Sequence, residues 1–361
     1  MRAERILLLR TSALGDVVHC LPVLSALRRA RPGAWIGWVV EKPIAPLLAG
    51  HPDLDELLVV GLRRWRRRPF AAATLREAGA FAAALDRFGA DLVLDLMGNH
   101  KAGVLAALTS ADRRIGAARR FRREPSSALW LSEEVPLRGV HAVDRALSLL
   151  DALDVPPAPA DFGGTKLSPL VPEPVREYLA AHPEPFVLLH PGAGWGNKRY
   201  PPAGWGEVAR RLRAATGIPT WVGVAPGEEG LAAEVVAHAG GTGGTGGEGA
   251  AVAVSAPDLP SFAALSRAAR LVLGGDSGPL HLAHALGAPV LMLMGPTDPE
   301  RNGPYGAPER ALFKLLPCSF CHRRFAETKA CLLEISPARV AARAIEDLAR
   351  APKAHDDQDL R

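Results

Sequence analysis

The sequence predicts an α/β protein made of two Rossmann-like, doubly wound domains that face each other across a cleft. Three observations lead to this fold class. The chain has 361 residues, too many for one ordinary core but suited to two domains of roughly 150 residues each. Short apolar runs alternate with helical patterns in both halves, the order that produces parallel sheets. Residues 155–174 are dense in proline and predict a linker between the halves.

These observations divide the chain into four parts. We expect an N-terminal domain over residues 1–155, a C-terminal domain over 175–335, a last helix over 336–350 and a disordered tail over 351–361. Because a cleft between two such domains suits a transferase with two substrates, each domain is expected to bind one of them.

The first domain begins with an apolar run at residues 5–10, which predicts a buried strand. After a polar loop, an amphipathic pattern over 17–31 predicts one helix, ended by Pro32 and Gly33. The first turn lacks G-x-G-x-x-G and has only Gly15, which argues against a dehydrogenase. Further strands are predicted at 34–40, 57–60, 92–95 and 114–117, and a further helix at 71–88.

The second half repeats this scheme. Strands are predicted at 186–190, 220–224, 251–254, 271–275 and 289–295. Helices are predicted at 175–182, 202–216, 231–238, 259–269, from Pro279 onward, and at 337–350. A glycine-rich tract at 238–251 follows a helix rather than a strand, so we interpret it as a flexible surface insertion and not as a phosphate loop.

Positive charge is concentrated in the first half. Residues 1–150 contain 23 Lys and Arg against 15 Asp and Glu, whereas residues 151–361 contain 20 against 23. The cations gather at residues 63–68 and 113–123. This asymmetry indicates an anionic partner for the first domain: a membrane surface, an anionic glycan or nucleic acid. Nucleic acid is disfavoured, because neither a stacking platform nor a helix-turn-helix is visible.

The turn between the strands at 271–275 and 289–295 is the strongest candidate for a ligand site. Asp276, Ser277 and Gly278 precede the helix, so Asp276 or Ser277 can cap it and Gly278 lets the backbone approach a ligand. A helix N-terminus at the end of a parallel strand suits a phosphate. A well-capped turn without function is the alternative, but His281 and Thr297 favour a functional one.

Two further loops follow predicted strands. Asp16 ends the first loop, where a carboxylate can take the proton of an attacking hydroxyl; alternatively, it only caps the helix that follows. His19 lies one turn further on and could tune Asp16, or serve only in packing. Lys198 lies in the loop after the strand at 186–190, where it can neutralise a diphosphate leaving group or belong to a solvated Lys-Arg pair.

These motifs resemble the ADP-heptose:lipopolysaccharide heptosyltransferases, glycosyltransferase family 9, which have the GT-B fold. The family's D-[ST]-G-x-x-H turn and G-P-T-D stretch appear at residues 276–281 and 295–298, and its T-S-x-x-G-D loop at 11–16. The resemblance implies an inverting, metal-independent transfer of L-glycero-D-manno-heptose from ADP-heptose to the lipopolysaccharide inner core, either Kdo-lipid A or a heptosylated core. No cofactor is implied.

The resemblance also assigns residues. It makes Asp16 the catalytic base and assigns one group of residues to the sugar nucleotide and another to the acceptor. The nucleotide group is Lys198, Glu228, Glu229, Asp276, Ser277, Gly278, His281 and Thr297, with one of the two glutamates at the ribose. The acceptor group is Arg63, Arg64, Arg66 and Arg67, which could otherwise form a solvated basic segment. Alternative functions are a related GT-B transferase that uses another sugar nucleotide, and a non-catalytic binder of anionic glycan or lipid.

The carboxyl-terminal cysteines resemble heptosyltransferase II, whereas the Arg-Trp segment resembles heptosyltransferase I, so the position of the acceptor in the core stays open. Cys318, Cys321 and Cys331 are expected to be structural and free of metal, because a second C-x-x-C pair is absent. Without a signal peptide or a membrane-spanning run, the protein is expected in the cytoplasm, peripheral on the inner face of the anionic inner membrane.

Overall fold

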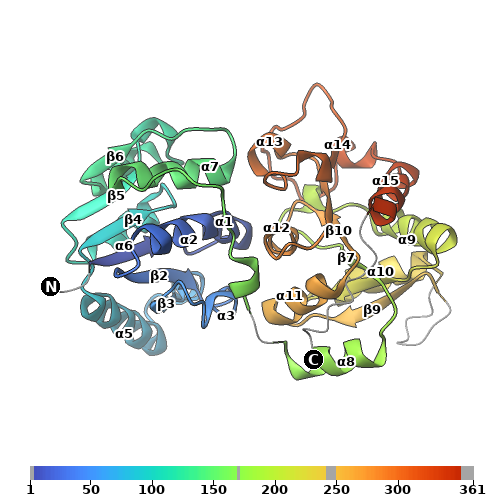
Figure 1. Ribbon diagram of the computed structural model, residues 1–361, viewed down its shortest axis with the longest axis horizontal. Coiled ribbons are helices and arrows are strands. Elements are labelled where there is room, and N and C mark those ends of the chain that lie inside the picture. Colours follow the sequence, from blue (N-terminus) through green and yellow to red (C-terminus); the bar gives the residue numbers. More distant parts are fainter. Residues whose placement is uncertain (1–3, 169–170, 241–248, 351–361) are drawn as a thin grey trace. The chain divides into compact units, whose positions relative to one another are not determined.

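The computed structural model describes residues 4–168, 171–240 and 249–350, and the chain divides into two compact units with the boundary between Pro169 and Leu170 (Figure 1). We call them unit 1 and unit 2. Parts of two sequence predictions, the glycine-rich tract at 241–248 and the tail at 351–361, lie outside the described residues. Among the described residues, no helix is long and apolar enough to cross a membrane.

Unit 1 contains a six-stranded sheet with the strand order β3-β2-β1-β4-β5-β6, and all of its pairs are parallel. Its strands are β1 (Arg5–Leu9), β2 (Trp35–Glu41), β3 (Glu56–Val60), β4 (Leu92–Asp95), β5 (Arg113–Ala117) and β6 (Glu133–Val135). The order reverses between β1 and β4. Loops that leave these two neighbouring strands therefore meet at a switch point, where open α/β sheets bind ligands.

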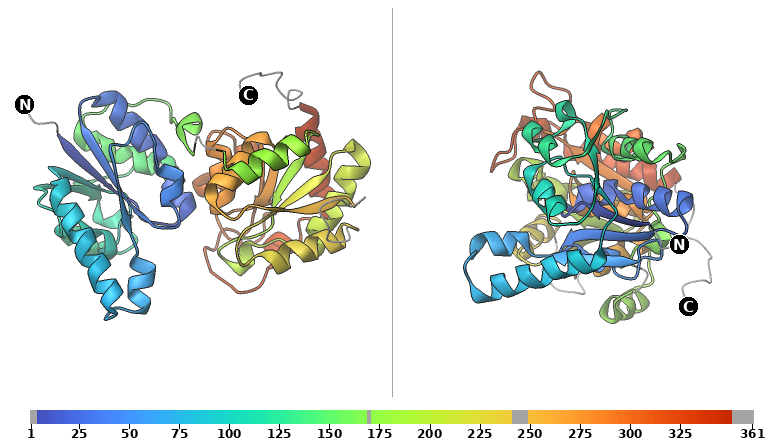
Figure 2. Two further views of the ribbon diagram at one scale, coloured as in Figure 1. Left: turned by 90° about the horizontal axis from the view of Figure 1, so that it is seen from below. Right: turned by 90° about the vertical axis from the view of Figure 1, so that its left-hand side faces the viewer.

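The helices of unit 1 cover both faces of this sheet (Figures 1 and 2). They are α1 (Leu14–His19), α2 (Leu21–Ala30), α3 (Ala45–Leu48), α4 (Leu62–Arg67), α5 (Ala72–Phe88), α6 (His100–Ala107) and α7 (Ala142–Leu147). Short 3-10 turns include η2 (Pro125–Trp130), beside α6. Phe81, Leu85 and Phe88 of α5 pack with Leu105 of α6 over one face of the sheet.

The single helix predicted over residues 17–31 is wrong, because α1 and α2 are separate helices that meet at Cys20. Pro22, in the first turn of α2, has no N–H to continue the hydrogen bonding of α1, which explains the break. The sequence also gave no prediction for the three-residue strands β6 and β12 (Ala311–Phe313). Both lie at sheet edges and are too short to show a pattern.

Unit 2 repeats the topology of unit 1, with the parallel order β12-β11-β10-β7-β8-β9. Its other strands are β7 (Val187–His190), β8 (Thr220–Val224), β9 (Ala251–Ser255), β10 (Leu271–Gly275) and β11 (Val290–Met294). The switch point lies between β7 and β10, whose register pairs Gly274 with His190. The loops after these two strands, which carry Lys198 and Asp276, consequently leave the sheet side by side.

The helices of unit 2 again form two layers. They are α8 (Glu173–Ala181), α9 (Pro202–Thr216), α10 (Glu229–His238), α11 (Leu259–Ala268), α12 (Gly278–Ala285), α13 (Pro299–Asn302), α14 (Ala330–Leu333) and α15 (Pro337–Arg350). Trp205 of α9, Val235 of α10 and Val340 of α15 are buried in one core over the sheet. Because β7, β10 and β11 are buried along their whole length, the sheet is a rigid support for the loops at its edge.

Candidate functional site

Asp276 is the centre of a buried polar cluster at the switch point of unit 2. Its Oδ2 accepts hydrogen bonds from Lys198 Nζ at 2.5 Å and from Thr297 Oγ1. Its Oδ1 lies 2.9 Å from His281 Nε2. The structure thus brings together four residues that the resemblance assigned to the sugar nucleotide, from the loops after β7, β10 and β11 and the start of α12.

The charge of Asp276 is strongly stabilised. Burial by itself would raise the pKa of this carboxyl group, but the His281 hydrogen bond and the Lys198 charge outweigh burial and hold the pKa well below its usual range. The idea that Asp276 caps α12 is wrong, since its oxygens are used by this cluster. Ser277 occupies the N-cap position without a side-chain capping bond, and its buried hydroxyl has no hydrogen-bond partner among the described residues.

The two loops approach each other so closely that a side chain between them is excluded. A Cβ on Gly275 would lie 2.4 Å from the carbonyl oxygen of Lys198. This contact, together with the ion pair, fixes the ammonium group beside the N-terminus of α12, which begins at Gly278. Lys198 Nζ also lies 4.6 Å from the centre of the Trp195 ring. The cluster therefore presents a fixed cation, a hydroxyl group and helix N–H groups, which together suit a phosphate.

The two adjacent glutamates lie in different environments. Glu228 is half-buried beside Gly192, where a Cβ would meet its carboxylate at 2.0 Å, and its Oε2 lies 4.0 Å from His190 Nδ1. Burial raises the pKa of Glu228, and its Oε2 has no hydrogen-bond partner among the described residues. Glu229 instead begins α10, accepts a bond from Gly227 N and lines a pocket of about 280 Å³ beyond β8 and β9.

Asp16 lies at the switch point of unit 1, in the first turn of α1. Its Oδ2 accepts from Arg10 at 2.6 Å and from the backbone N–H of Ala13 at 3.2 Å. Burial by itself would lower the pKa of the Arg10 guanidinium, but the charge of Asp16 contributes to raising this pKa above its usual value. The Asp16 side chain is 43 % exposed. Because both of these contacts use Oδ2, the other oxygen of this accessible carboxylate remains to accept a proton. His19 packs instead edge-on against His141, with ring centres 5.4 Å apart.

Glu41 and Lys101 are candidate site residues that the sequence analysis missed. Glu41 ends β2 and is buried, which raises the pKa of its carboxyl group, while the charges of Lys101 and Arg63 oppose this shift. Lys101 lies in the first turn of α6. The charges of Glu41, Arg63 and Arg10 are close enough to change the pKa of its ammonium group. A carboxylate at the carboxyl end of a strand was the available signal, the same signal that selected Asp16.

The four arginines assigned to the acceptor lie on α4, yet they face different neighbours. Arg63 and Arg66 are close enough to influence the Lys101 ammonium at the edge of the sheet. Arg64 forms an ion pair with Glu77 of α5. Arg67, also exposed, lies at the end of α4. Of the four, Arg63 and Arg66 therefore act on the charge of Lys101, whereas Arg64 is paired on α5.

The second basic cluster, residues 113–123, is less available to an anionic partner than the sequence suggested. Arg122 is buried and lies 2.5 Å from Asp95, at the end of β4. Arg113 pairs with Glu133 at 2.7 Å. Asp95 also accepts from the backbone N–H groups of Met97 and Gly98. Arg122 is thus not a free cation for an anionic partner, which corrects its inclusion in that cluster.

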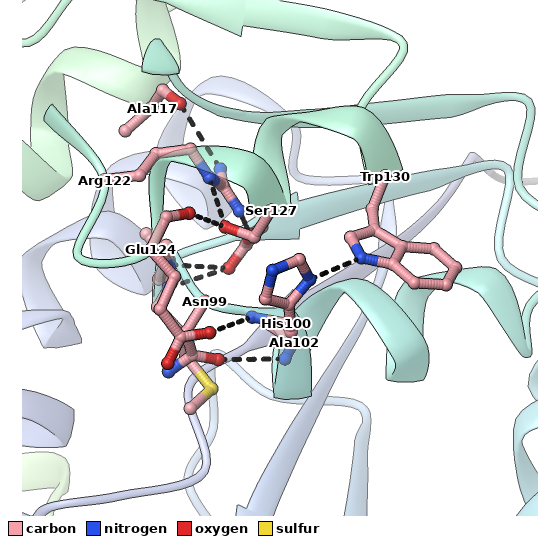
Figure 3. Close-up of polar contacts among 12 residues, drawn as sticks. Asn99, His100, Ala102, Ala117, Arg122, Glu124, Ser127 and Trp130 are labelled. Carbon is pink, nitrogen blue, oxygen red and sulfur yellow. Dashed lines mark hydrogen bonds and ion pairs between the residues drawn. The ribbon is translucent and has the colours of Figure 1, made fainter. Parts of the chain in front are cut away.

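The Arg122 pair belongs to a network that fixes the loop in front of α6 (Figure 3). Arg122 donates to Ser127 at 2.8 Å, and Glu124 accepts from the backbone of His100 at 2.8 Å. The His100 ring accepts from Trp130 Nε1 at 3.0 Å, while Asn99 caps the helix by accepting from Ala102 N. These contacts hold the first turn of α6, and so the backbone of Lys101, at the switch point.

The carboxyl-terminal cysteines are free thiols in a segment that contacts the loops after β7 and β11. Cys318 and Cys321 are exposed and Cys331 is buried, where a Cβ on Gly295 would lie 3.1 Å from its sulfur. Asn197 holds the intervening segment by donating to Arg323 O at 2.9 Å and accepting from Phe325 N at 3.2 Å. Among the described residues, no group of three or more His, Cys, Asp or Glu side chains has a geometry that could hold a metal ion.

The chain is similar to known proteins over most of its length. The model of "Glycosyltransferase family 9 (heptosyltransferase)" matches residues 78–331. The lipopolysaccharide heptosyltransferase 1 of Pseudomonas aeruginosa PAO1 is 32 % identical and covers 97 % of this chain and 99 % of its own. The enzyme of the same name from Escherichia coli K12 is 30 % identical over 84 % of this chain and 91 % of its own. The structure of E. coli heptosyltransferase WaaC with ADP has a TM-score of 0.78 at 25 % identity and covers 95 % of this chain and 99 % of its own.

Proposed function

Because this chain belongs to glycosyltransferase family 9, the heptosyltransferases, and has their GT-B fold, we propose that it transfers L-glycero-D-manno-heptose from ADP-heptose to the inner core of lipopolysaccharide. The chain is a glycosyltransferase by family membership. The relatives named heptosyltransferase 1 favour an acceptor that does not yet contain heptose. The Asp276 cluster is the observation that carries the proposal, because it forms a phosphate-binding arrangement at the switch point of a Rossmann-like unit.

In this proposal unit 2 binds the sugar nucleotide. Asp276 orients Lys198, whose ammonium has three N–H donors, so two remain for the diphosphate. Ser277 and the first N–H groups of α12 add neutral donors on the same side. Glu228 is the glutamate proposed for the ribose, because its buried, unpaired oxygen gains a partner when a ribose hydroxyl donates to it.

Unit 1 binds the acceptor and supplies the base. Asp16 accepts the proton of the acceptor hydroxyl as that oxygen attacks the anomeric carbon and the bond from this carbon to the diphosphate breaks. A single displacement inverts the configuration, and ADP leaves with its charge stabilised by Lys198. Arg63, Arg66 and Lys101 lie where they can hold the anionic groups of the acceptor, and Arg64 and Arg67 are on the same helix, α4.

The cluster supplies positive charge from Lys198 and from α12, so we propose that the reaction proceeds without a divalent cation. Turnover is expected to be unchanged by EDTA, and a loss that magnesium restores would contradict this part of the proposal. We further propose that the enzyme acts in the cytoplasm at the inner face of the inner membrane, because the proposed acceptor carries lipid A.

The direct test incubates the protein with ADP-heptose and a heptose-deficient lipopolysaccharide core. ADP should appear together with a core enlarged by one heptose. A parallel reaction with a core that already contains heptose distinguishes the two acceptor positions. If ADP is released with neither acceptor, or if another sugar nucleotide is used better, the proposed substrates are wrong.

A further inference from the structure

We propose that the outer end of the α4–α5 hairpin binds the surface of an anionic phospholipid bilayer. This surface, the hairpin tip, consists of Arg68, Phe70, Leu75 and Arg76. The inference rests on the proposed function in one respect, since that function requires an acceptor held by lipid. It concerns side chains outside the residues assigned to the donor and the acceptor.

The hairpin tip exposes two large apolar side chains. Phe70 lies in the turn between the helices and is 90 % exposed, and Leu75, in the first turn of α5, is 60 % exposed. Neither side chain contributes to the core of unit 1, because α5 packs on the sheet through Phe81, Leu85 and Phe88 instead. Both therefore belong to the same end of the hairpin, and insertion of such exposed apolar side chains into a membrane interface removes them from water.

The charge around these side chains fits an anionic surface. Residues 62–76 contain six arginines and no acidic residue. The next residue, Glu77, forms an ion pair with Arg64. Arg68 and Arg76 are exposed, and in the sequence they stand within two positions of Phe70 and Leu75. Clustered cations next to exposed apolar groups are the combination that binds anionic bilayers, because each kind of side chain meets its own layer of the interface.

The hairpin has an inner and an outer end. α4 begins next to the carboxyl end of β3, where the backbone of Arg63 hydrogen-bonds to Glu41. From there α4 runs outward, and both views in Figure 2 show the turn to α5 at the end that points away from the sheet. Trp65 fixes the hairpin from inside, donating to Glu77 at 3.0 Å and packing on Phe81. The inner end therefore belongs to the acceptor site, and the outer end is presented to a further partner.

Other partners fit this surface less well. A second copy of the chain, paired about a two-fold axis, would place two arginine-rich tips against each other, which is electrostatically unfavourable. The sugar part of the acceptor offers anionic groups for the arginines but no apolar layer for Phe70 and Leu75. A bilayer containing anionic phospholipid offers both.

Vesicle sedimentation tests the proposal with the full chain and no acceptor. Wild-type protein should bind vesicles of phosphatidylethanolamine and phosphatidylglycerol, and should bind phosphatidylcholine vesicles much more weakly. The variant Phe70→Ser/Leu75→Ser should lose most of this binding. The variant Arg68→Gln/Arg76→Gln should lose roughly fivefold in partition coefficient per arginine, the factor that corresponds to about 1 kcal/mol for each cation near an anionic surface.

A matched control removes an exposed apolar side chain from unit 2. Leu315 is 70 % exposed, and Leu315→Ser should bind vesicles like the wild type. Equal loss in the control, unchanged binding in both tip variants, or no wild-type binding to anionic vesicles would overturn the proposal. So would a lipid-free dimer that the tip variants convert to a monomer, since the surface would then join two copies.

Activity separates this proposal from the proposed function. With a water-soluble acceptor that lacks lipid chains, the tip variants should turn over at the wild-type rate, whereas turnover on acceptor embedded in vesicles should fall. If the wild type transfers no heptose but the tip variants still lose vesicle binding, the proposed function fails and the hairpin tip stands. If transfer is normal and vesicle binding does not depend on the tip, the tip proposal fails alone.

Discussion

The switch points of unit 1 and unit 2 arise from the same strand order, yet each holds its carboxylate in a different way. In unit 2, Asp276 is buried and has partners on both oxygens, including the cation Lys198. In unit 1, Asp16 is 43 % exposed, and its contacts with Arg10 and Ala13 use one oxygen. A carboxylate with partners on all sides can only position other groups, whereas a carboxylate with an accessible oxygen can accept a proton. Topology thus selects where chemistry occurs, and the local partners decide which chemistry it is.

The largest expected effect of this difference is on stability. Asp276→Ala leaves Lys198 without its buried partner and should lower the free energy of unfolding by about 3–5 kcal/mol. Asp16→Ala breaks a pair that is partly exposed and should cost no more than about 1 kcal/mol. Denaturant unfolding of the two variants checks this, and equal losses would remove the proposed distinction between the carboxylates.

The next largest effect is on turnover. Asp16→Asn keeps the size of the side chain but removes the base, so kcat should fall on the order of a hundredfold or more. Asp112→Asn, a change at an exposed aspartate of the same unit, is the matched control and should leave kcat unchanged. Near-normal turnover of Asp16→Asn would mean that another group accepts the proton.

The sequence predicted the strands that support the sites better than the contacts between the side chains. The strands at 271–275 and 220–224 were predicted with the observed bounds, because continuous apolar runs are bounded by polar turns. The sequence left open whether Asp276 or Ser277 caps the helix, whereas Asp276 bonds to Lys198, 78 positions away, and no local pattern reports such a pairing. Arg122 was assigned to a basic surface for the same reason, since its partner Asp95 lies on another strand.

A third effect concerns the stability of the fold at acidic pH. Burial, followed by the charge of Arg199, lowers the pKa of His190 to about 4. As pH falls below the unfolded pKa of about 6.5, the unfolded chain takes up a proton that the folded chain takes up only near pH 4, so stability is lost across this window. The free energy of unfolding should drop by about 2 kcal/mol between pH 7 and pH 5 from this histidine. His190→Gln should flatten the profile there; an unchanged slope would exclude His190 as the cause.

The smallest expected effect divides the arginines of α4. Arg63→Gln/Arg66→Gln removes the two that act on Lys101 and should raise the acceptor KM roughly tenfold, the loss of about one charge-assisted hydrogen bond. Arg64→Gln/Arg67→Gln removes the same amount of charge and should raise the acceptor KM less. Added salt should reduce the difference, because exposed charges are screened within about 10 Å at 0.1 M. Equal effects of the two pairs would show that only net charge matters, and a change in the donor KM would place α4 in the nucleotide site.

We propose that unit 2 binds the nucleotide and that unit 1 supplies the catalytic base. Calorimetry of ADP binding to Lys198→Ala and Asp16→Asn tests this assignment most directly. Lys198→Ala should weaken ADP binding by roughly 1–3 kcal/mol, because the diphosphate loses its charged partner. Asp16→Asn should bind ADP as tightly as the wild type does while failing to turn over. If both variants lose ADP affinity to the same extent, or if Lys198→Ala loses none, then unit 2 is not the nucleotide-binding unit in the way described.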